Sequence, residues 1–203
     1  MIRLQVHPQN PQGRYIQHAA NVLNEGGLIV YPTDTVYGLG CNLFNKKAVE
    51  RIYQIKGAKK RMRLSFICSD LKNIAQFAHV STPAYKIMRS LLPGPFTFIL
   101  KASRLVPKIL LEKRKTVGIR VPDNKICHDL LSEFGNPIIS TSLNLPGKPY
   151  LNDPDEIEEI FYHNVDLFVD AGFGGIEPST IIELSDDQPT LLRAGKGADL
   201  LAF

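Results

Sequence analysis

The sequence predicts a single α+β domain, residues 1–203, in which helices flank a mixed β-sheet. Three observations predict this fold class. The 203 residues show no break in composition and 44% of them are apolar, which is enough for one core of ordinary size. Apolar periodicity indicates about seven strands and four or five helices. Because these elements do not alternate regularly, a doubly wound parallel sheet is not expected.

Five segments have the apolar spacing of an amphipathic helix. In chain order they are 14–26, 45–55, 82–92, 123–135 and 153–165. Glycines follow the first and fourth segments, and Pro93 follows the third. Asn45 and Asp123 are the expected N-caps of the second and fourth helices. The acids that open the fifth helix suit the helix dipole.

Short β-branched and aromatic runs predict the strands. In chain order they lie within 27–33, 63–69, 96–102, 116–122, 137–144, 165–172, 179–184 and 190–195. The stretch 33–41, rich in glycine and polar residues, is expected to be a turn region. The chain has no repeat or low-complexity linker, which favours one domain.

Charge is strongly polarised along the chain. Residues 1–148 carry 22 Lys and Arg against 8 Asp and Glu, whereas residues 149–192 carry 11 acids and no Lys or Arg. A basic body attracts polyanions through phosphate contacts and counterion release. The alternative is that the two segments neutralise each other in the folded protein.

Several classes of protein are not expected. No apolar run approaches the ~20 residues of a membrane-spanning helix, and no signal peptide is apparent. The three cysteines are scattered and indicate buried, reduced thiols, so a cytoplasmic protein is expected. The five histidines show no metal-ligand spacing. Phosphate-loop, dinucleotide-binding, serine-hydrolase and zinc-protease motifs are all missing from the sequence.

Small polar residues and glycines gather at four strand ends, in 32–40, 93–97, 140–144 and 178–180. Hydroxyls and free backbone N–H groups at strand ends bind ligands in many α/β proteins. Each cluster alone is also typical of turns and caps. Cations lie beside them in the 56–63 run and at Arg120 and Arg193, where the partner is either a ligand anion or a structural carboxylate.

These residues carry a resemblance to a known family. The segments YPTDTVYGLGC (31–41), IYQIKG (52–57), PGPFTFIL (93–100), VGIRVPDN (117–124), STSLNLPG (140–147), PSTIIEL (178–184) and LLRAG (191–195) occur in this order. Together they resemble the YrdC-like family of L-threonylcarbamoyladenylate synthases over nearly the whole chain. The segments VHPQNPQGR (6–14) and EKRKTVGIRVP (112–122) are most similar to its YciO branch.

The resemblance implies a twisted, largely closed mixed sheet with helices outside, around a basic concave pocket. It also implies a reaction in which L-threonine, bicarbonate and ATP with Mg²⁺ give threonylcarbamoyl-AMP and pyrophosphate. That product serves tRNA modification at position 37, so tRNA and tRNA-modification proteins are the implied partners. All reacting groups are anionic, so catalysis would consist of positioning and charge stabilisation, with no protein nucleophile.

The resemblance also assigns roles to residues. The implied catalytic residues are Lys56, Arg120, Ser142 and Asn144. The implied threonine-side residues are Thr33, Arg120, Ser140, Ser179 and Thr180. The implied nucleotide-side residues are Lys56, Thr116, Ser142, Asn144 and Arg193.

Two departures from the family pattern bear on activity. The synthases have a Lys-x-Arg (KxR) signature. Here Lys56 matches its lysine, but Ala58 stands at the arginine position, and Met62 occupies a position that is usually polar. Pro146 replaces a serine of the loop that follows Asn144. Loss of an arginine that neutralises phosphate removes about 2–4 kcal/mol of transition-state stabilisation, so weak or altered synthase activity is expected.

The alternative is a non-catalytic RNA-binding protein that acts on tRNA, ribosomal RNA or other double-stranded RNA. The basic body favours it, and the expected phosphate contacts are Lys59, Lys60, Arg61, Arg63, Lys113, Arg114 and Lys115. Binding of this kind would recognise shape and phosphate charge rather than bases.

Overall fold

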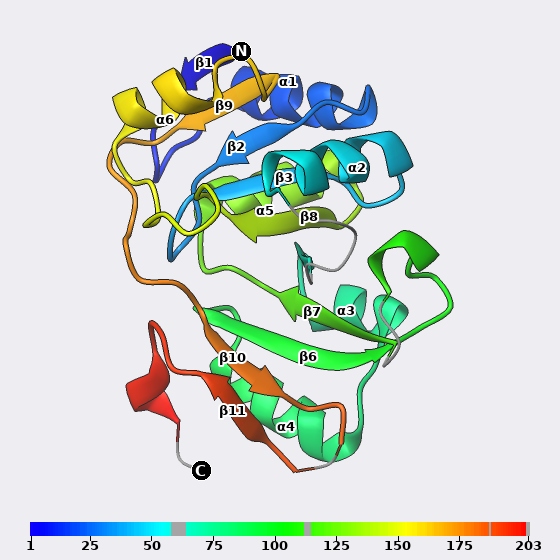
Figure 1. Ribbon diagram of the computed structural model, residues 1–203. Helices are drawn as coiled ribbons and strands as arrows, with labels where there is room; N and C mark the ends of the chain where they lie inside the picture. The colour runs from blue at the N-terminus through cyan, green and yellow to red at the C-terminus, as the bar shows by residue number, and fades with distance from the viewer. Residues whose placement is uncertain (58–63, 112–114, 187, 202–203) are drawn as a thin grey trace.

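The computed structural model describes residues 1–57, 64–111, 115–186 and 188–201, and these residues form one curved sheet with helices on both faces (Figure 1). The strands are β1 (Ile2–Gln5), β2 (Ile29–Tyr31), β3 (Gly38–Asn42), β4 (Ser65–Ile67), β5 (Ala78–His79), β6 (Phe96–Ala102), β7 (Thr116–Arg120), β8 (Ile138–Ser142), β9 (Leu167–Asp170), β10 (Thr180–Glu183) and β11 (Thr190–Arg193). The helices are α1 (Gly13–Asn24), α2 (Lys46–Ile55), α3 (Leu71–Phe77), α4 (Thr82–Leu91), α5 (Lys125–Phe134) and α6 (Pro154–Phe161).

The strand order is β1-β9-β2-β3-β8-β4-β7-β6-β10-β11, with β5 attached to β6. Four pairs are parallel, namely β1 with β9, β2 with β9, β4 with β7 and β6 with β10; the other pairs are antiparallel. The predicted mixed sheet with outer helices is therefore confirmed. The pairing is a path with two edges, β1 at the top and β11 at the bottom of Figure 1, so the sheet curves without closing into a ring.

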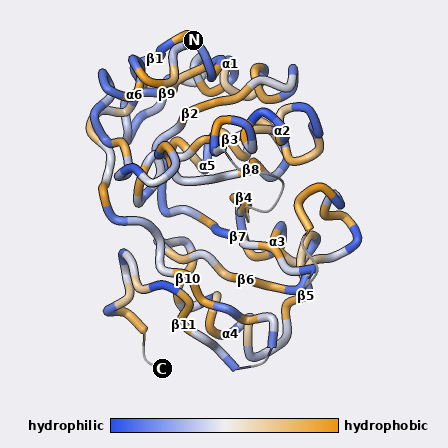
Figure 2. Tube along the Cα trace, viewed as in Figure 1, coloured by the Kyte–Doolittle hydropathy of each residue, from blue (hydrophilic) through white to orange (hydrophobic). Residues whose placement is uncertain are grey.

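Alternation along the strands builds two faces. In β7, Val117 and Ile119 belong to the core that is covered by α2, α3, α4 and α6, while Gly118 and Arg120 point to the opposite face. That opposite face has its own core under α1 and α5, which covers only part of it. Figure 2 shows hydrophobic residues along the strands, as in β2, and hydrophilic residues in the loops and outer helix turns. The uncovered part of the second face is where a cavity lies.

Cap chemistry explains where two of the helices begin. Asn45 accepts a hydrogen bond from the Ala48 amide at 3.0 Å, which confirms it as the N-cap of α2. The prediction that Asp123 caps α5 is wrong, because Asn124 accepts from the Cys127 amide at 3.0 Å instead. Gly135 ends α5 with φ +73°, a left-handed conformation that suits glycine.

The expected turn over 33–41 is wrong in its second half, which forms β3. Glycine is needed there because β3 lies between β2 and β8 with little room. A Cβ on Gly40 would come within 2.7 Å of Tyr31 Cε1 and 2.6 Å of the Ile139 carbonyl oxygen. The glycines that predict a turn thus permit close strand packing.

The sequence analysis also missed three elements: β1, α3 and β5. They have four, seven and two residues, respectively, which is too short for apolar periodicity to register. The strand β1 pairs only with β9, whose residues lie far along the chain, so its neighbour gives no local signal.

The acidic segment pairs with the basic body at several points. Arg3 contacts Asp155 at 2.8 Å, Glu158 at 2.6 Å and Asp170 at 2.9 Å. Asp166 lies 2.9 Å from Arg51. For these carboxylates, the alternative explanation of the charge pattern is therefore correct: the acidic segment neutralises part of the basic body in the folded protein.

The three cysteines and the helices agree with what the composition predicts. Cys41, Cys68 and Cys127 are buried and free, as predicted, and burial raises the pKa of the Cys41 thiol to about 12. Among the described residues, no helix has the length and apolar character needed to cross a bilayer.

Candidate functional site

A cavity of about 380 Å³ lies on the uncovered part of the second sheet face. This volume is within the range of small-molecule sites. Five strands and the β2–β3 loop contribute hydroxyls and two arginines to it. The polar lining residues are Thr33, Ser65, Thr97, Arg120, Ser140, Thr141, Ser142, Ser179 and Arg193.

The β2–β3 loop presents Thr33 to the cavity in a fixed orientation. Its hydroxyl donates to the Val36 carbonyl at 2.6 Å and accepts from the Thr35 amide at 3.1 Å. These bonds close a tight turn of the kind that Ser and Thr form with their own backbone. The hydroxyl oxygen is thus held at the cavity wall by the loop itself.

Arg120 is the most buried cation of the cavity, with 8% of its surface exposed. Its Nη2 forms an ion pair with Oδ1 of Asp34, and the Asp123 amide donates to Asp34 Oδ2 at 3.1 Å. The Nε of Arg120 is buried and has no hydrogen-bond partner among the residues that the structure describes. A buried donor without a partner costs about 1–3 kcal/mol, so this guanidinium retains capacity for an anion.

Arg193 lies on the edge strand β11 and is held by Ser179. Its Nη2 and Nε donate to the Ser179 carbonyl at 2.7 and 3.1 Å. The Ser179 hydroxyl forms a hydrogen bond of 2.8 Å with that of Thr97, across the parallel pair β6–β10. Hydroxyls and a guanidinium therefore meet at this end of the cavity.

Lys56 holds the loop that follows β8. Its ammonium donates to the Ser142 carbonyl at 2.7 Å, the Asn144 carbonyl at 2.9 Å and Asn144 Oδ1 at 2.6 Å. Asn144 Nδ2 donates in turn to the Lys148 carbonyl at 3.2 Å. Burial lowers the pKa of Lys56 to about 8.

The structure brings most of the sequence-predicted site residues together. Those that line the cavity are Thr33, Arg120, Ser140, Ser142, Ser179 and Arg193. Lys56 and Asn144 lie beside it and connect to it through Ser142. Thr116 is outside the lining, at the start of β7 opposite Lys101. Thr180 is fully buried, and its hydroxyl donates to the Gly195 and Lys196 carbonyls at 2.9 Å.

The expected RNA contacts fall almost wholly outside the described residues. Those outside are Lys59, Lys60, Arg61, Arg63, Lys113 and Arg114. Lys115 is described; it is exposed and has φ +52°. RNA binding stays a prediction. Within the described ranges, no group of three or more His, Cys, Asp or Glu is placed to hold a metal ion.

Asp34 and Lys196 were missing from the predicted site. Asp34 pairs with Arg120, and Lys196 donates to the Asp34 carbonyl at 2.7 Å. Both residues stand within or next to the segments that the family resemblance rests on, at 31–41 and 191–195. Asp34 could have been found from the sequence, because a buried arginine such as Arg120 needs an anionic partner.

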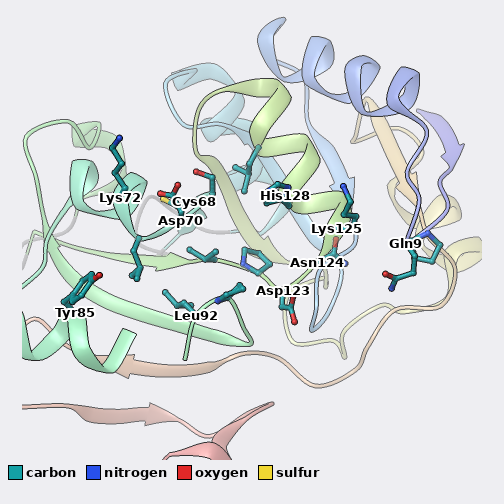
Figure 3. A pocket seen from close by; sticks show the side chains of 17 residues that line it. Gln9, Cys68, Asp70, Lys72, Tyr85, Leu92, Asp123, Asn124, Lys125 and His128 are labelled. Atoms are coloured by element: carbon teal, nitrogen blue, oxygen red, sulfur yellow. The ribbon is translucent and has the colours of Figure 1, made fainter. Parts of the chain in front are cut away.

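A larger cavity, of about 1040 Å³, lies elsewhere, beyond the ends of the parallel strands β4 and β7 (Figure 3). Residues of α3, α4 and α5 line it, including Lys72, Tyr85 and His128. None of the sequence-predicted site residues that the structure describes lines it. Its cationic side chains share it with Asp70 and Asp123, so the lining favours no single charge on a ligand.

The depressed pKa of Lys56 predicts a change of stability with pH. Below about pH 8 the ammonium is charged in both states, and its burial opposes folding. Between about 8 and the ordinary value of 10.5, the unfolded chain binds the extra proton, so the free energy of unfolding rises with pH. Denaturant unfolding of the wild type, measured relative to Lys56→Met from pH 7 to 10.5, is expected to show this rise.

A control for that titration is Lys47→Met, which replaces an exposed lysine of α2. This variant shows how much of any pH dependence comes from the loss of a lysine at an exposed position. If the difference between the wild type and Lys56→Met stayed flat, or fell with pH, the Lys56 ammonium would not be desolvated in the folded state.

Comparison with known proteins agrees with this geometry. The Sua5, YciO and YrdC family model, described as "Telomere recombination", matches residues 21–195. The chain is 43% identical to the uncharacterized protein YciO of Escherichia coli over 95% of its own length and 94% of that protein. The crystal structure of E. coli YciO superposes with a TM-score of 0.93, covers 97% of both chains and is 42% identical.

Two further matches come from Pyrococcus abyssi. Its threonylcarbamoyl-AMP synthase is 33% identical over 89% of this chain and 54% of that protein. The crystal structure of P. abyssi Sua5 complexed with L-threonine gives a TM-score of 0.88 and 31% identity, and the match covers 96% of this chain and 58% of that one. The curved sheet, the hydroxyl-lined cavity with its two arginines and these matches lead to one conclusion: this chain belongs to the Sua5–YciO–YrdC family.

Proposed function

We propose that this chain binds L-threonine and ATP in the 380 Å³ cavity and forms threonylcarbamoyl-AMP from them with bicarbonate, at a lower rate than the family's synthases. The observation that carries the proposal is Arg120, a buried guanidinium at the cavity wall whose Nε has no partner within the described ranges. The similarity to a Sua5 structure complexed with L-threonine supports the choice of ligand.

The threonine end of the cavity lies around Arg120. A guanidinium binds a carboxylate in a planar arrangement, and Arg120 brings such a group to the cavity lining. The hydroxyls of Thr33 and Ser140 line the same cavity and are able to bond the ammonium or hydroxyl of the amino acid. Ser179 and Thr97, bonded to each other, lie beside Arg193 and complete the polar wall of the cavity.

The nucleotide end lies toward Arg193 and Ser142. Arg193 supplies a positive charge for phosphate, and the loop at Ser142 is fixed from behind by Lys56. All three ammonium protons of Lys56 are used within that loop. We therefore assign Lys56 the role of holding the loop in the ligand-free protein.

The proposed chemistry needs no nucleophile from the protein. The threonine amine and bicarbonate give a carbamate and water, and a carbamate oxygen then attacks the α-phosphorus of ATP. The bond from that phosphorus to the bridging oxygen breaks, and its electron pair leaves with pyrophosphate. Mg²⁺ enters as part of the ATP substrate and shields phosphate charge. The chain's own share is to align anionic groups beside Arg120 and Arg193.

The product carries an activated carbamoyl group, so an acceptor must take it up. The family resemblance implies tRNA as that acceptor and tRNA-modification proteins as the partners that complete the transfer. Both belong to the proposal.

The proposal is tested by incubation of the purified protein with ATP, Mg²⁺, bicarbonate and L-threonine. Pyrophosphate and threonylcarbamoyl-AMP are measured. Threonine-dependent formation of both products is the expected result. No product from a folded protein that still binds structured RNA in a salt-sensitive way would overturn the synthase and favour the RNA-binding alternative.

A gain-of-function variant tests the cause of the weak rate. Ala58→Arg restores the family's KxR signature after Lys56. Because an arginine on phosphate contributes about 2–4 kcal/mol, kcat/KM is expected to rise at least about 10-fold. The Ala58→Gln variant, of similar length but neutral, is the matched control. Equal rates for the two variants would exclude the missing charge as the cause.

A further inference from the structure

We infer that Asp34 is a positioning residue, which fixes the guanidinium of Arg120 for ligand binding; this inference rests on the proposed function. Asp34 sits in the β2–β3 loop and has 10% of its side chain exposed. Its partner Arg120 ends β7, on a strand far away in the sequence. The pair therefore joins a loop to a strand end at the wall of the cavity.

The carboxylate of Asp34 is held from two sides. Oδ1 accepts from Arg120 Nη2, and Oδ2 accepts from the Asp123 amide at 3.1 Å. Asp123 lies three residues after Arg120, the last residue of β7. Both partners therefore belong to the same short segment, and the carboxylate cannot rotate without losing one of them.

This arrangement decides what Arg120 is able to do. A buried cation needs a counter-charge, and Asp34 supplies it before any ligand arrives. One side of the guanidinium is then occupied, while Nε stays without a partner. The ligand carboxylate meets a guanidinium of fixed orientation, which reduces the entropy lost on binding.

The backbone of Asp34 reaches a second side of the cavity. Its carbonyl accepts from Lys196 Nζ at 2.7 Å. The Lys196 amide donates to the Pro178 carbonyl at 2.9 Å, next to Ser179 in the cavity lining. Asp34 thus links the β2–β3 loop to the segment beside Ser179.

A ligand-free experiment tests the positioning role directly. Asp34→Asn keeps the shape of the side chain and removes its charge. Side-chain ¹⁵N–¹H spectra are recorded, and the Arg120 Nε–H signal is assigned through Arg120→Lys. In the wild type this signal is expected to be sharp and slow to exchange with water. In Asp34→Asn its exchange is expected to speed up at least about 10-fold, because the ion pair no longer holds the group. Unchanged exchange would overturn the inference.

L-threonine binding by calorimetry gives the second readout. Asp34→Asn is expected to raise Kd about 10-fold, and Asp34→Glu to recover part of that loss. In the Arg120→Lys background, Asp34→Asn is expected to add little, because the two residues act as a unit. Lys86→Ala, at an exposed lysine of α4, is the control that leaves Kd unchanged. Additive losses would mean that Asp34 acts independently of Arg120, and would overturn the inference. A wild type that binds no L-threonine would instead defeat the proposed function, and the exchange experiment would still decide the role of Asp34.

Discussion

Replacing Arg120 with alanine is expected to abolish measurable L-threonine binding and to lower threonine-dependent turnover at least about 100-fold. The guanidinium is the most buried positive charge in the cavity lining, and no described residue pairs with its buried Nε. Loss of it removes the partner for the amino-acid carboxylate. It also leaves the Asp34 carboxylate without its cation next to the cavity, and this negative charge disfavours an anionic ligand. Calorimetry with L-threonine and the pyrophosphate assay measure the two effects.

The same change is expected to destabilise the fold, because Asp34 would be left buried without its cation. Removing one partner of such a pair costs about 3 kcal/mol, so binding must be measured on protein shown to be folded. Arg89→Ala, at an exposed arginine of α4, controls for loss of charge alone. Partial recovery of binding on addition of ethylguanidinium would show that the missing group, rather than misfolding, is responsible. Threonine binding at wild-type strength in Arg120→Ala would remove the basis of the proposed function.

Gly40→Ala is expected to lower the free energy of unfolding by about 3 kcal/mol, with a fall in Tm of about 6–10 °C. The added Cβ would lie 2.6 Å from the Ile139 carbonyl oxygen and 2.9 Å from Ile138 Cγ2, both on the neighbouring strand β8. A backbone carbonyl cannot turn away as a side chain can, so β3 and β8 must separate. Because β8 carries Ser140 and Ser142, ligand binding is expected to weaken as well.

The matched control is Gly13→Ala at the first residue of α1. No heavy atom lies within 4 Å of the position that the added Cβ would take, and a helix favours alanine over glycine. This variant is expected to stay within about 1 kcal/mol of the wild type. If the two variants were equally stable, the close packing at Gly40 would not constrain the sheet.

Local signals were sufficient for the long elements. β6 was predicted at its observed bounds, 96–102, because the alternation of FTFILKA and the preceding prolines mark both ends. α2 was located by its cap at Asn45. β3 was missed because glycine has the same local signature in a turn and in a crowded strand. Only the distant partners Tyr31 and Ile139 distinguish the two cases.

The sequence was sufficient to predict most of the residues that line the cavity, but not the groups with which they form hydrogen bonds and ion pairs. Polar clusters at strand ends indicated a shared site, and the structure brings Thr33, Ser140 and Ser179 to one cavity. Thr180 belongs to the same cluster as Ser179, yet strand alternation turns its side chain to the 195–196 backbone instead. The partner of Arg120 was uncertain because ligand anions and carboxylates satisfy a guanidinium equally well.

The residues that line the cavity come from widely separated parts of the chain, and this has a consequence for folding during synthesis. Thr33 comes from the beginning of the chain, Ser140 from its later half, and Arg193 from an edge strand that forms after all the others in sequence. A growing polypeptide can pair β2 with β3 early, but it cannot offer a complete binding site until β10 and β11 have been synthesised and added to β6. Ligand therefore cannot assist the folding of the first half of the chain on the ribosome; it can stabilise only the finished sheet.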